Sequence, residues 1–131
     1  MIDIHDLCIG NWVYDGERTQ FPMQVVGIGS DYVYLDFPQN EGDLWESKPE
    51  DLQGIPLPEE LLKKIGFTCF LCESTGIFSK KEGEYCIKVK PELSQVCIYG
   101  FDNHISNKIT YLHELQNFVF LTTKQQLKVN L

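Results

Sequence analysis

The sequence contains no long hydrophobic run. None of its apolar stretches approaches the roughly 18 residues that a membrane-spanning helix requires. The first six residues carry two aspartates where an export signal would carry basic residues, and no apolar segment follows them. We therefore expect a protein without a membrane anchor that stays in the cytoplasm.

Basic residues are scarce, and the imbalance is confined to one half of the chain. Eleven lysines and arginines face nineteen aspartates and glutamates, which gives a net charge of −8 over 131 residues. Residues 1–66 hold thirteen acidic and four basic side chains, whereas residues 67–131 hold six and seven. A phosphate backbone would be repelled by the first part and hardly attracted by the second, so direct nucleic-acid binding is disfavoured.

The chain also lacks the second cysteine pair that a zinc ribbon needs. Cys69 and Cys72 form a C-x2-C pair, but Cys86 and Cys97 are separated by ten residues. Five cysteines, an odd number without an export signal, indicate reduced thiols. Small buried thiols are the favoured interpretation, and metal or redox chemistry at these four positions is the alternative.

Other catalytic and ligand motifs are incomplete. His113 begins an H-E-x-x-H motif whose second histidine is replaced by Asn117. Cys97 and His104 would form a nucleophile and a base without a local oxyanion hole or orienting group. The acidic segment 36–51 lacks the spaced ligands of a calcium loop. We therefore expect no enzyme activity, no cofactor and no bound metal.

The first half has the pattern of short strands separated by turns. Apolar and aromatic segments predict strands at residues 7–14, 21–28, 32–37, 44–46 and 55–57. Within the third of these, Val33 and Leu35 share the face that is expected in the core. Ser47 and Glu50 have the spacing of a capping box, which predicts a single helical turn before the last strand. This order is typical of a small SH3-like barrel, which we place at residues 1–57.

The second half predicts an antiparallel meander with one packed helix, so the whole chain is expected to be α+β. Residues 58–66 form the clearest helix, a linking helix with Gly66 as its left-handed stop. The domain that follows, residues 67–131, has predicted strands at 67–73, 76–79, 84–90, 95–101, 108–112 and 127–131, a loop at 102–107 and a helix at 113–123. The last strand, LKVNL, alternates strictly and would offer an edge for pairing between two copies of the chain, a homo-oligomer.

Three well-separated strings resemble a known group of sequences. They are LCIGNWVY at residues 7–14, WESKPEDLQ at 45–53 and YLHELQN at 111–117. Through them the chain resembles an uncharacterised family of small proteins from gut bacteria that is often associated with phages and other mobile elements. The resemblance implies a cytoplasmic setting and brings no activity, cofactor or site residue with it.

The best functional candidate is a surface in the first half, where aromatic and acidic side chains alternate. Its members are Trp12, Tyr14, Tyr32, Tyr34, Asp36, Asp43 and Glu46. Exposed aromatic rings beside carboxylates suit a cationic side chain, through attraction to the ring face and through long-range steering. The alternative is that Trp12 and some of the tyrosines belong to the core.

These patterns leave three functional hypotheses. The leading one is a non-enzymatic interaction module that docks a basic protein partner on the acidic aromatic face. The second is an acidic nucleic-acid mimic, or anti-defence protein, of a mobile element that competes for a DNA-binding enzyme. The third is a thiol- or metal-dependent enzyme that uses Cys69, Cys72, Cys86 or Cys97.

Overall fold

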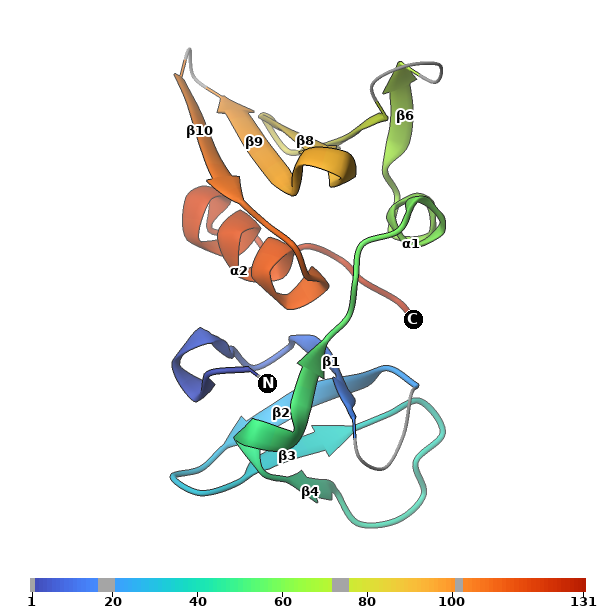
Figure 1. Ribbon diagram of the computed structural model, residues 1–131, viewed down its shortest axis with the longest axis vertical. Coiled ribbons are helices and arrows are strands. Elements are labelled where there is room, and N and C mark those ends of the chain that lie inside the picture. The colour runs from blue at the N-terminus through green and yellow to red at the C-terminus, as the bar shows by residue number, and fades with distance from the viewer. Residues whose placement is uncertain (1, 17–20, 72–75, 101–102) are drawn as a thin grey trace. The chain divides into compact units, whose positions relative to one another are not determined.

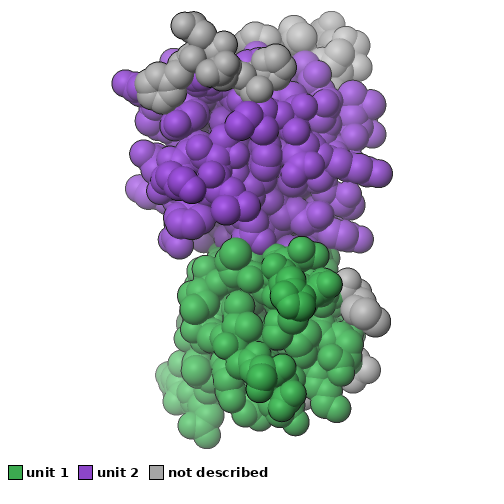
Figure 2. Space-filling view, turned by 90° about the vertical axis from the view of Figure 1, so that its left-hand side faces the viewer, with its two compact units in different colours: residues 1–55 green, residues 56–131 purple. Residues whose placement is uncertain are grey.

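A computed structural model describes residues 2–16, 21–71, 76–100 and 103–131, and the side chains of all of these except 70, 71, 103 and 104. It is an α+β fold with two antiparallel sheets and one main helix, which confirms the predicted class. The chain divides into two compact units, Met1–Ile55 (unit 1) and Pro56–Leu131 (unit 2), which Figure 2 colours separately. Over the described ranges, no helix is long and apolar enough to cross a membrane.

Unit 1 is a five-stranded sheet whose last strand returns to the first (Figure 1). Its strands are β1 (Trp12–Asp15), β2 (Met23–Ile28), β3 (Val33–Asp36), β4 (Trp45–Ser47) and β5 (Leu52–Gly54). They lie in the order β4-β3-β2-β1-β5, and each neighbouring pair is antiparallel. One 3₁₀ turn, η1 (Ile4–Asp6), precedes β1, and a second, η2 (Pro49–Asp51), leads from β4 into β5.

The core of unit 1 is built from alternate residues of these strands, because successive side chains of a strand point to opposite faces. The cluster consists of Ile2, Leu7, Val13, Met23, Val25, Val33, Leu35 and Leu52, with Phe37 and Trp45 packed against it. The predicted core positions Val33 and Leu35 are confirmed, since neither has any exposed surface.

The sheet of unit 1 is strongly curled. Strands β4 and β1 are separated by two others, and at the usual strand spacing a flat sheet would hold them about 14 Å apart. Nevertheless the indole Nε1 of Trp45 on β4 donates a hydrogen bond of 2.8 Å to Oδ2 of Asp15 on β1. The edge strands β4 and β5 are not paired with each other in the described sheet, so the sheet is curled without being a closed barrel.

Two predictions for the end of unit 1 are wrong. Ser47 does not cap the helical turn, because its side chain is buried opposite Val33. Instead η2 starts after Lys48 with Pro49 at its first position, where the fixed backbone angle of proline favours a helical turn. The last strand is β5 rather than residues 55–57, and Pro56 forms only an isolated bridge.

Unit 2 is a second five-stranded antiparallel sheet with two helices (Figure 1). Its elements are α1 (Glu59–Lys64), β6 (Thr68–Leu71), β7 (Ile77–Glu82), β8 (Tyr85–Lys90), a 3₁₀ turn η3 (Pro91–Leu93), β9 (Gln95–Gly100), β10 (Asn103–Lys108) and α2 (Leu112–Thr123). The strands follow one another in the order β10-β9-β8-β7-β6, which is the predicted meander. Helix α2 lies against one face of this sheet and buries Leu112, Leu115 and Val119.

The C-terminal end of α1 follows the predicted chemistry. Gly66 has a φ of +104°, a conformation that side chains with a Cβ rarely adopt, and the Phe67 amide donates to the Leu62 carbonyl at 2.9 Å. Lys80 of β7 adds a further cap, because its Nζ donates to the carbonyl oxygen of Ile65 at 3.0 Å. The Gly66 stop is therefore confirmed.

Three predictions for the last third of the chain are wrong. The predicted loop 102–107 contains β10, whose polar residues are held in a strand by backbone pairing with β9 rather than by a buried face. The predicted strand 108–112 is absent, because α2 begins at Leu112. Residues 127–131 form no strand either. Leu127 and Val129 are buried, so the alternation reflects side-chain packing, and the expected pairing of two copies through this strand loses its structural basis.

Candidate functional site

The residues of the predicted acidic aromatic face do not form one exposed surface. Trp12 is only 6% exposed, so the prediction that it meets a partner is corrected: the side chain is buried, although alternation along β1 places Val13, and not Trp12, on the face of the core cluster. Tyr14 and Tyr34 are half-buried. Tyr34 lies opposite Gly27 on β2, and its ring covers that glycine so closely that an added Cβ would lie 3.4 Å from Cδ2. Of the four aromatic residues, Tyr32 is the exposed one.

The acidic residues of the predicted face also differ in how exposed they are. Asp36 is part of the turn that follows β3, because its Oδ1 accepts hydrogen bonds from the Phe37 amide at 2.9 Å and from Nδ2 of Asn40 at 2.8 Å. Asp43 and Glu46 are exposed. Asp36 thus has a local structural role, while the other two carboxylates face solvent.

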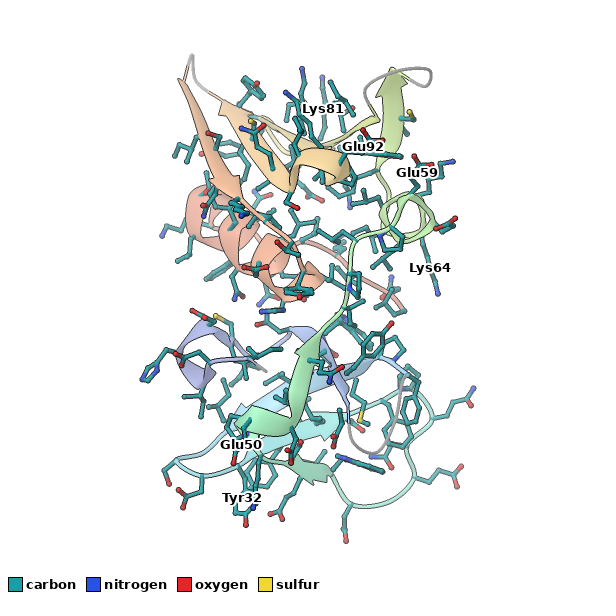
Figure 3. The ribbon with its side chains drawn as sticks, viewed as in Figure 1. Tyr32, Glu50, Glu59, Lys64, Lys81 and Glu92 are labelled. Carbon is teal, nitrogen blue, oxygen red and sulfur yellow. The ribbon has the colours of Figure 1, made fainter. Side chains whose placement is uncertain are left out.

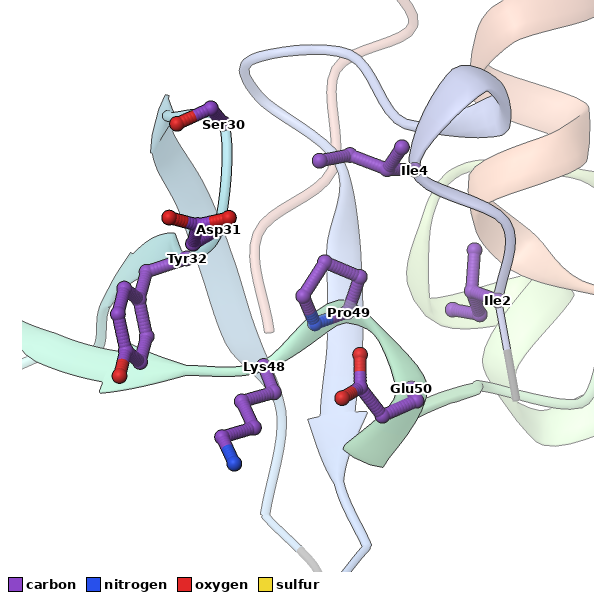
Figure 4. Close-up of a pocket in the computed structure, with 8 residues that line it drawn as sticks. All are labelled: Ile2, Ile4, Ser30, Asp31, Tyr32, Lys48, Pro49 and Glu50. Carbon is purple, nitrogen blue, oxygen red and sulfur yellow. The ribbon is translucent and has the colours of Figure 1, made fainter.

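A hollow of about 480 Å³ lies beside Tyr32, and Figure 4 shows the residues that line it. It is lined by three segments that are distant in sequence: the N-terminal segment, the turn between β2 and β3, and the start of η2. The lining residues are Ile2, Ile4, Ser30, Asp31, Tyr32, Lys48, Pro49 and Glu50. Ile2, Ile4 and Pro49 form an apolar wall, and the other lining side chains are polar.

Short-range hydrogen bonds hold all three segments in place. The Gly29 amide donates to the Tyr32 carbonyl at 2.8 Å and closes the turn between β2 and β3. The Asp51 amide donates to the Lys48 carbonyl at 3.0 Å and closes η2. Both polar sides of the hollow therefore lie on tight turns, which fix the backbone from which the side chains of Tyr32 and Glu50 project.

Asp3 fixes the N-terminal segment. Its Oδ1 accepts a hydrogen bond from the backbone amide of His5 at 2.9 Å and lies 2.8 Å from Nδ1 of the His5 ring. These hydrogen bonds, the backbone one first, favour the ionised carboxylate and hold the pKa of Asp3 below its ordinary value. As the cap of η1, Asp3 places Ile4 at the edge of the hollow.

The hollow combines an apolar wall, one exposed tyrosine ring and two exposed carboxylates. The carboxylates of Asp31 and Glu50 exceed the single cation, Lys48, by one charge. Such a combination suits a ligand that has an alkyl part and a cationic end, because the alkyl part can pack on Pro49 while the cation lies near the tyrosine ring and the carboxylates.

The candidate thiol and metal residues form no metal-binding group among the described side chains, although Cys86 and Cys97 both lie near Tyr99. No group of three or more histidine, cysteine or acidic side chains is placed to hold a metal ion in the part of the chain that the structure describes. Cys72 and the side chain of His104 lie outside that part, so the pairs they would form with Cys69 and Cys97 are not described. His113 is buried, and its ring stacks on Tyr111 with a centroid distance of 6.0 Å.

Sequence reasoning found one residue of the hollow, Tyr32, and missed the others. Glu50 was assigned only to a capping box, and Asp31 and the N-terminal isoleucines carry no local signal for a site. No sequence signal joins these residues, because the Gly29–Tyr32 turn and the turn at Pro49 are brought to one side only by the strand order of the curled sheet.

No protein family, curated protein or solved structure matches this chain.

Proposed function

We propose that unit 1 is a non-enzymatic interaction module that binds a basic side chain of a partner protein in the hollow beside Tyr32. The observation that carries the proposal is the joining of an exposed tyrosine ring, the carboxylates of Asp31 and Glu50 and an apolar wall in one depression. The partner is cytoplasmic in this proposal, as the sequence patterns suggest.

Electrostatics support a cationic ligand over a neutral one. Residues 1–55 contain eleven acidic and two basic side chains, so the whole unit attracts cations before contact is made. On contact, a guanidinium or ammonium group over the Tyr32 ring contributes about 0.5–1 kcal/mol at an exposed site. These terms are individually small, so we expect one such contact to be weak and the full interface to extend beyond the hollow.

We further propose that unit 1 is an SH3-like barrel whose edges do not fully close. Three features support this assignment: the strand order β4-β3-β2-β1-β5, the 3₁₀ turn between β4 and β5, and the Trp45–Asp15 hydrogen bond across the curl. In such an arrangement the hollow lies where two connecting turns approach each other, which is a common place for a binding site on a rigid scaffold.

The test is a nuclear magnetic resonance titration of isotope-labelled protein with N-acetylarginine amide, and with the uncharged isostere N-acetylcitrulline amide. We expect saturable shifts at residues 30–32 and 48–50 with the arginine compound and much smaller ones with citrulline. The double variant Asp31→Asn/Glu50→Gln should weaken the arginine shifts. The matched control Glu41→Gln/Asp43→Asn removes the same charge from exposed positions of the same unit and should leave them largely unchanged.

A second candidate function, an acidic nucleic-acid mimic, is favoured by the excess of acidic side chains in residues 1–55. A mimic depends on many spaced carboxylates rather than on one hollow. Equal loss of binding in the two double variants would therefore favour the mimic and contradict the hollow. Absence of any saturable shift with the arginine compound would also contradict it.

A further inference from the structure

The second sheet has an outer face whose residues are fixed by strand register. Residues directly opposite each other in an antiparallel sheet share a face. Ile87 of β8 lies opposite Ile98 of β9, and both are buried. The intervening residue Lys88 lies opposite Cys97 of β9 and Ser79 of β7 and therefore belongs to the other face. Among the described residues of unit 2, no helix lies over that face of β8, β9 and β10 (Figure 1).

Four lysines cross this outer face and are called the lysine track: Lys81 of β7, Lys88 and Lys90 of β8, and Lys108 of β10. Gln95 of β9 lies between Lys90 and Lys108, which pair with it from its two neighbouring strands. Lys81 pairs with Cys86 of β8, and Lys88 is the next residue of β8 on the same face. Lys81 and Lys108 are exposed, and Lys88 and Lys90 are half-buried. Neighbouring lysines on β8 are about 7 Å apart along the strand.

Within β7–β10 themselves no acidic residue lies on the outer face, and the exposed Glu84 lies at the end of the sheet, in the turn between β7 and β8. Glu82 is on the inner face, where its Oε1 pairs with Nζ of Lys80 at 3.2 Å. Glu92 lies in η3 and Glu114 in α2. The near-neutral count of the second half therefore conceals a local excess of positive charge on one side of the sheet.

Tyr99 lies beside the track. It is 40% exposed, and Nζ of Lys88 is 5.1 Å from the centre of its ring. Cys97 and Ser106 lie in the next row of the face, and Cys86 and His104 are the residues opposite Tyr99 in its own row. The ring is thus exposed to solvent, with the ammonium group of Lys88 over it.

We propose that this outer face binds single-stranded nucleic acid, with the lysine track following the phosphates and Tyr99 stacking on a base. Charge complementarity argues for an anionic occupant. The residue composition of the face favours a nucleic acid over a protein as this occupant. Lysine and serine are depleted in protein–protein interfaces, whereas lysine, serine, glutamine and tyrosine are among the side chains that contact phosphate and sugar. A basic surface with an aromatic platform is the usual arrangement for single strands.

The net charge of −8 is unevenly distributed between the two units. Eleven of the nineteen acidic residues belong to residues 1–55, and unit 2 has nine basic and eight acidic residues. The acidic unit lowers the affinity, so we expect weak binding with a strong dependence on salt. This function is independent of the hollow in unit 1.

The experiment measures fluorescence anisotropy of short fluorescein-labelled oligothymidylate and oligouridylate with the full-length chain. Four phosphate contacts predict a slope of about −2.8 for log affinity against log salt, or about fiftyfold weaker binding between 50 and 200 mM salt. In Lys88→Gln/Lys90→Gln the slope should fall to about −1.4. Tyr99→Ala should weaken binding about tenfold, and Tyr99→Phe should restore it, because the phenylalanine ring still stacks.

The matched control is Lys63→Gln/Lys64→Gln, which removes two exposed lysines from α1 of the same unit. Figure 3 shows that Lys64 projects away from the side of the sheet on which Lys81 stands. This variant should keep the slope of the wild-type protein. Circular dichroism confirms that each variant is folded.

Three results would overturn the proposal. One is the absence of binding to either oligonucleotide at low salt. Another is an equal loss of affinity in the track variant and in the α1 variant, which would indicate attraction by general charge alone. The third is salt-sensitive self-association of the wild-type chain that Lys88→Gln/Lys90→Gln abolishes, because a second copy would then occupy the face.

Discussion

The indole Nε1 of Trp45 donates a hydrogen bond of 2.8 Å to Oδ2 of Asp15, a residue with no exposed surface. The two residues lie on strands that the sheet order separates by two others. This hydrogen bond therefore stabilises the curled shape of the sheet by joining β4 to β1, two strands that are not paired through their backbones in the described sheet. Because a buried carboxylate is costly without hydrogen-bond donors, each residue stabilises the position of the other.

Replacing Trp45 by phenylalanine should destabilise unit 1 by about 1–3 kcal/mol, because the buried carboxylate of Asp15 loses a donor. The phenylalanine ring keeps the apolar contact with Phe37, whose centroid is 6.5 Å from that of Trp45. Urea unfolding measures the change. The control Tyr32→Phe removes an exposed hydroxyl from the same unit and should change stability by less than about 0.5 kcal/mol. Equal midpoints for the two variants would show that the indole bond does not hold the curl.

Two adjacent lysines of β7 should respond differently to the same substitution. Lys80 donates to the Ile65 carbonyl at the end of α1 and pairs with Glu82, and its side chain is 18% exposed. Lys80→Met should therefore cost about 1–3 kcal/mol, since a capping donor and an ion-pair partner are lost. Lys81→Met, on the exposed face, should cost less than about 0.5 kcal/mol. Thermal unfolding of both variants checks the difference, and a similar loss in both would disprove the capping role of Lys80.

Glycine at position 124 should stabilise the protein. Lys124 ends α2 with φ +62° and ψ 18°, a left-handed conformation that glycine adopts at less cost than lysine. We expect Lys124→Gly to raise the free energy of unfolding by about 0.5–1 kcal/mol. Lys128→Gly removes the same charge from an exposed position outside the left-handed region and should lower it. Denaturant unfolding should therefore show a higher free energy of unfolding for Lys124→Gly and a lower one for Lys128→Gly. A loss of stability in both variants would contradict the strain at Lys124.

The phenol of Tyr99 should ionise late in an alkaline titration. Repulsion from the Cys97 thiolate raises the pKa of Tyr99 above its ordinary value of 10.0, and desolvation, a hydrogen bond with Cys97 and the charge of Cys86 act in the same direction. The folded protein thus holds the phenolic proton more tightly than the unfolded chain. This contribution to stability is complete below the ordinary tyrosine pKa and is lost as the pH rises through the raised one.

Ultraviolet absorbance of phenolate tests the Tyr99 prediction. The titration step that disappears in Tyr99→Phe belongs to Tyr99, and it should move to lower pH in Cys97→Ala. A step that stays in place in Cys97→Ala would show that the thiol is not the cause. Lys88→Gln provides the complementary control, because removing a nearby cation should move the step to higher pH.

The sequence was sufficient where structure depends on local chemistry. Gly66 after a short helix with basic residues in its last turn predicts a left-handed stop, and alternation at Val33 and Leu35 predicts a buried face. It was insufficient where partners are remote. The polar strand β10 is defined by its pairing with β9, and the alternating residues 127–131 bury side chains without joining a sheet.

The candidate site was harder to predict than the fold for the same reason. Trp12 and Tyr32 are both aromatic residues at or beside a strand, and only the three-dimensional arrangement makes one buried and the other exposed. Asp31 and Glu50 come together because β2, β3 and β4 are neighbours in the sheet, and no spacing along the chain encodes that proximity. The outer face of unit 2 likewise requires the register of four strands.

The pairing of β1 with β5 has a consequence for how unit 1 can be used by evolution or by design. Val13 lies opposite Gly54, so the chain leaves the unit beside the strand that opens its sheet. Domains whose entry and exit points are close together tolerate insertion into other chains and circular permutation. The sheet of unit 1 therefore starts and ends at neighbouring points, so an insertion of this kind would join the host at β1 and β5 and would have to keep the preceding segment, which supplies Ile2 and Leu7 to the core.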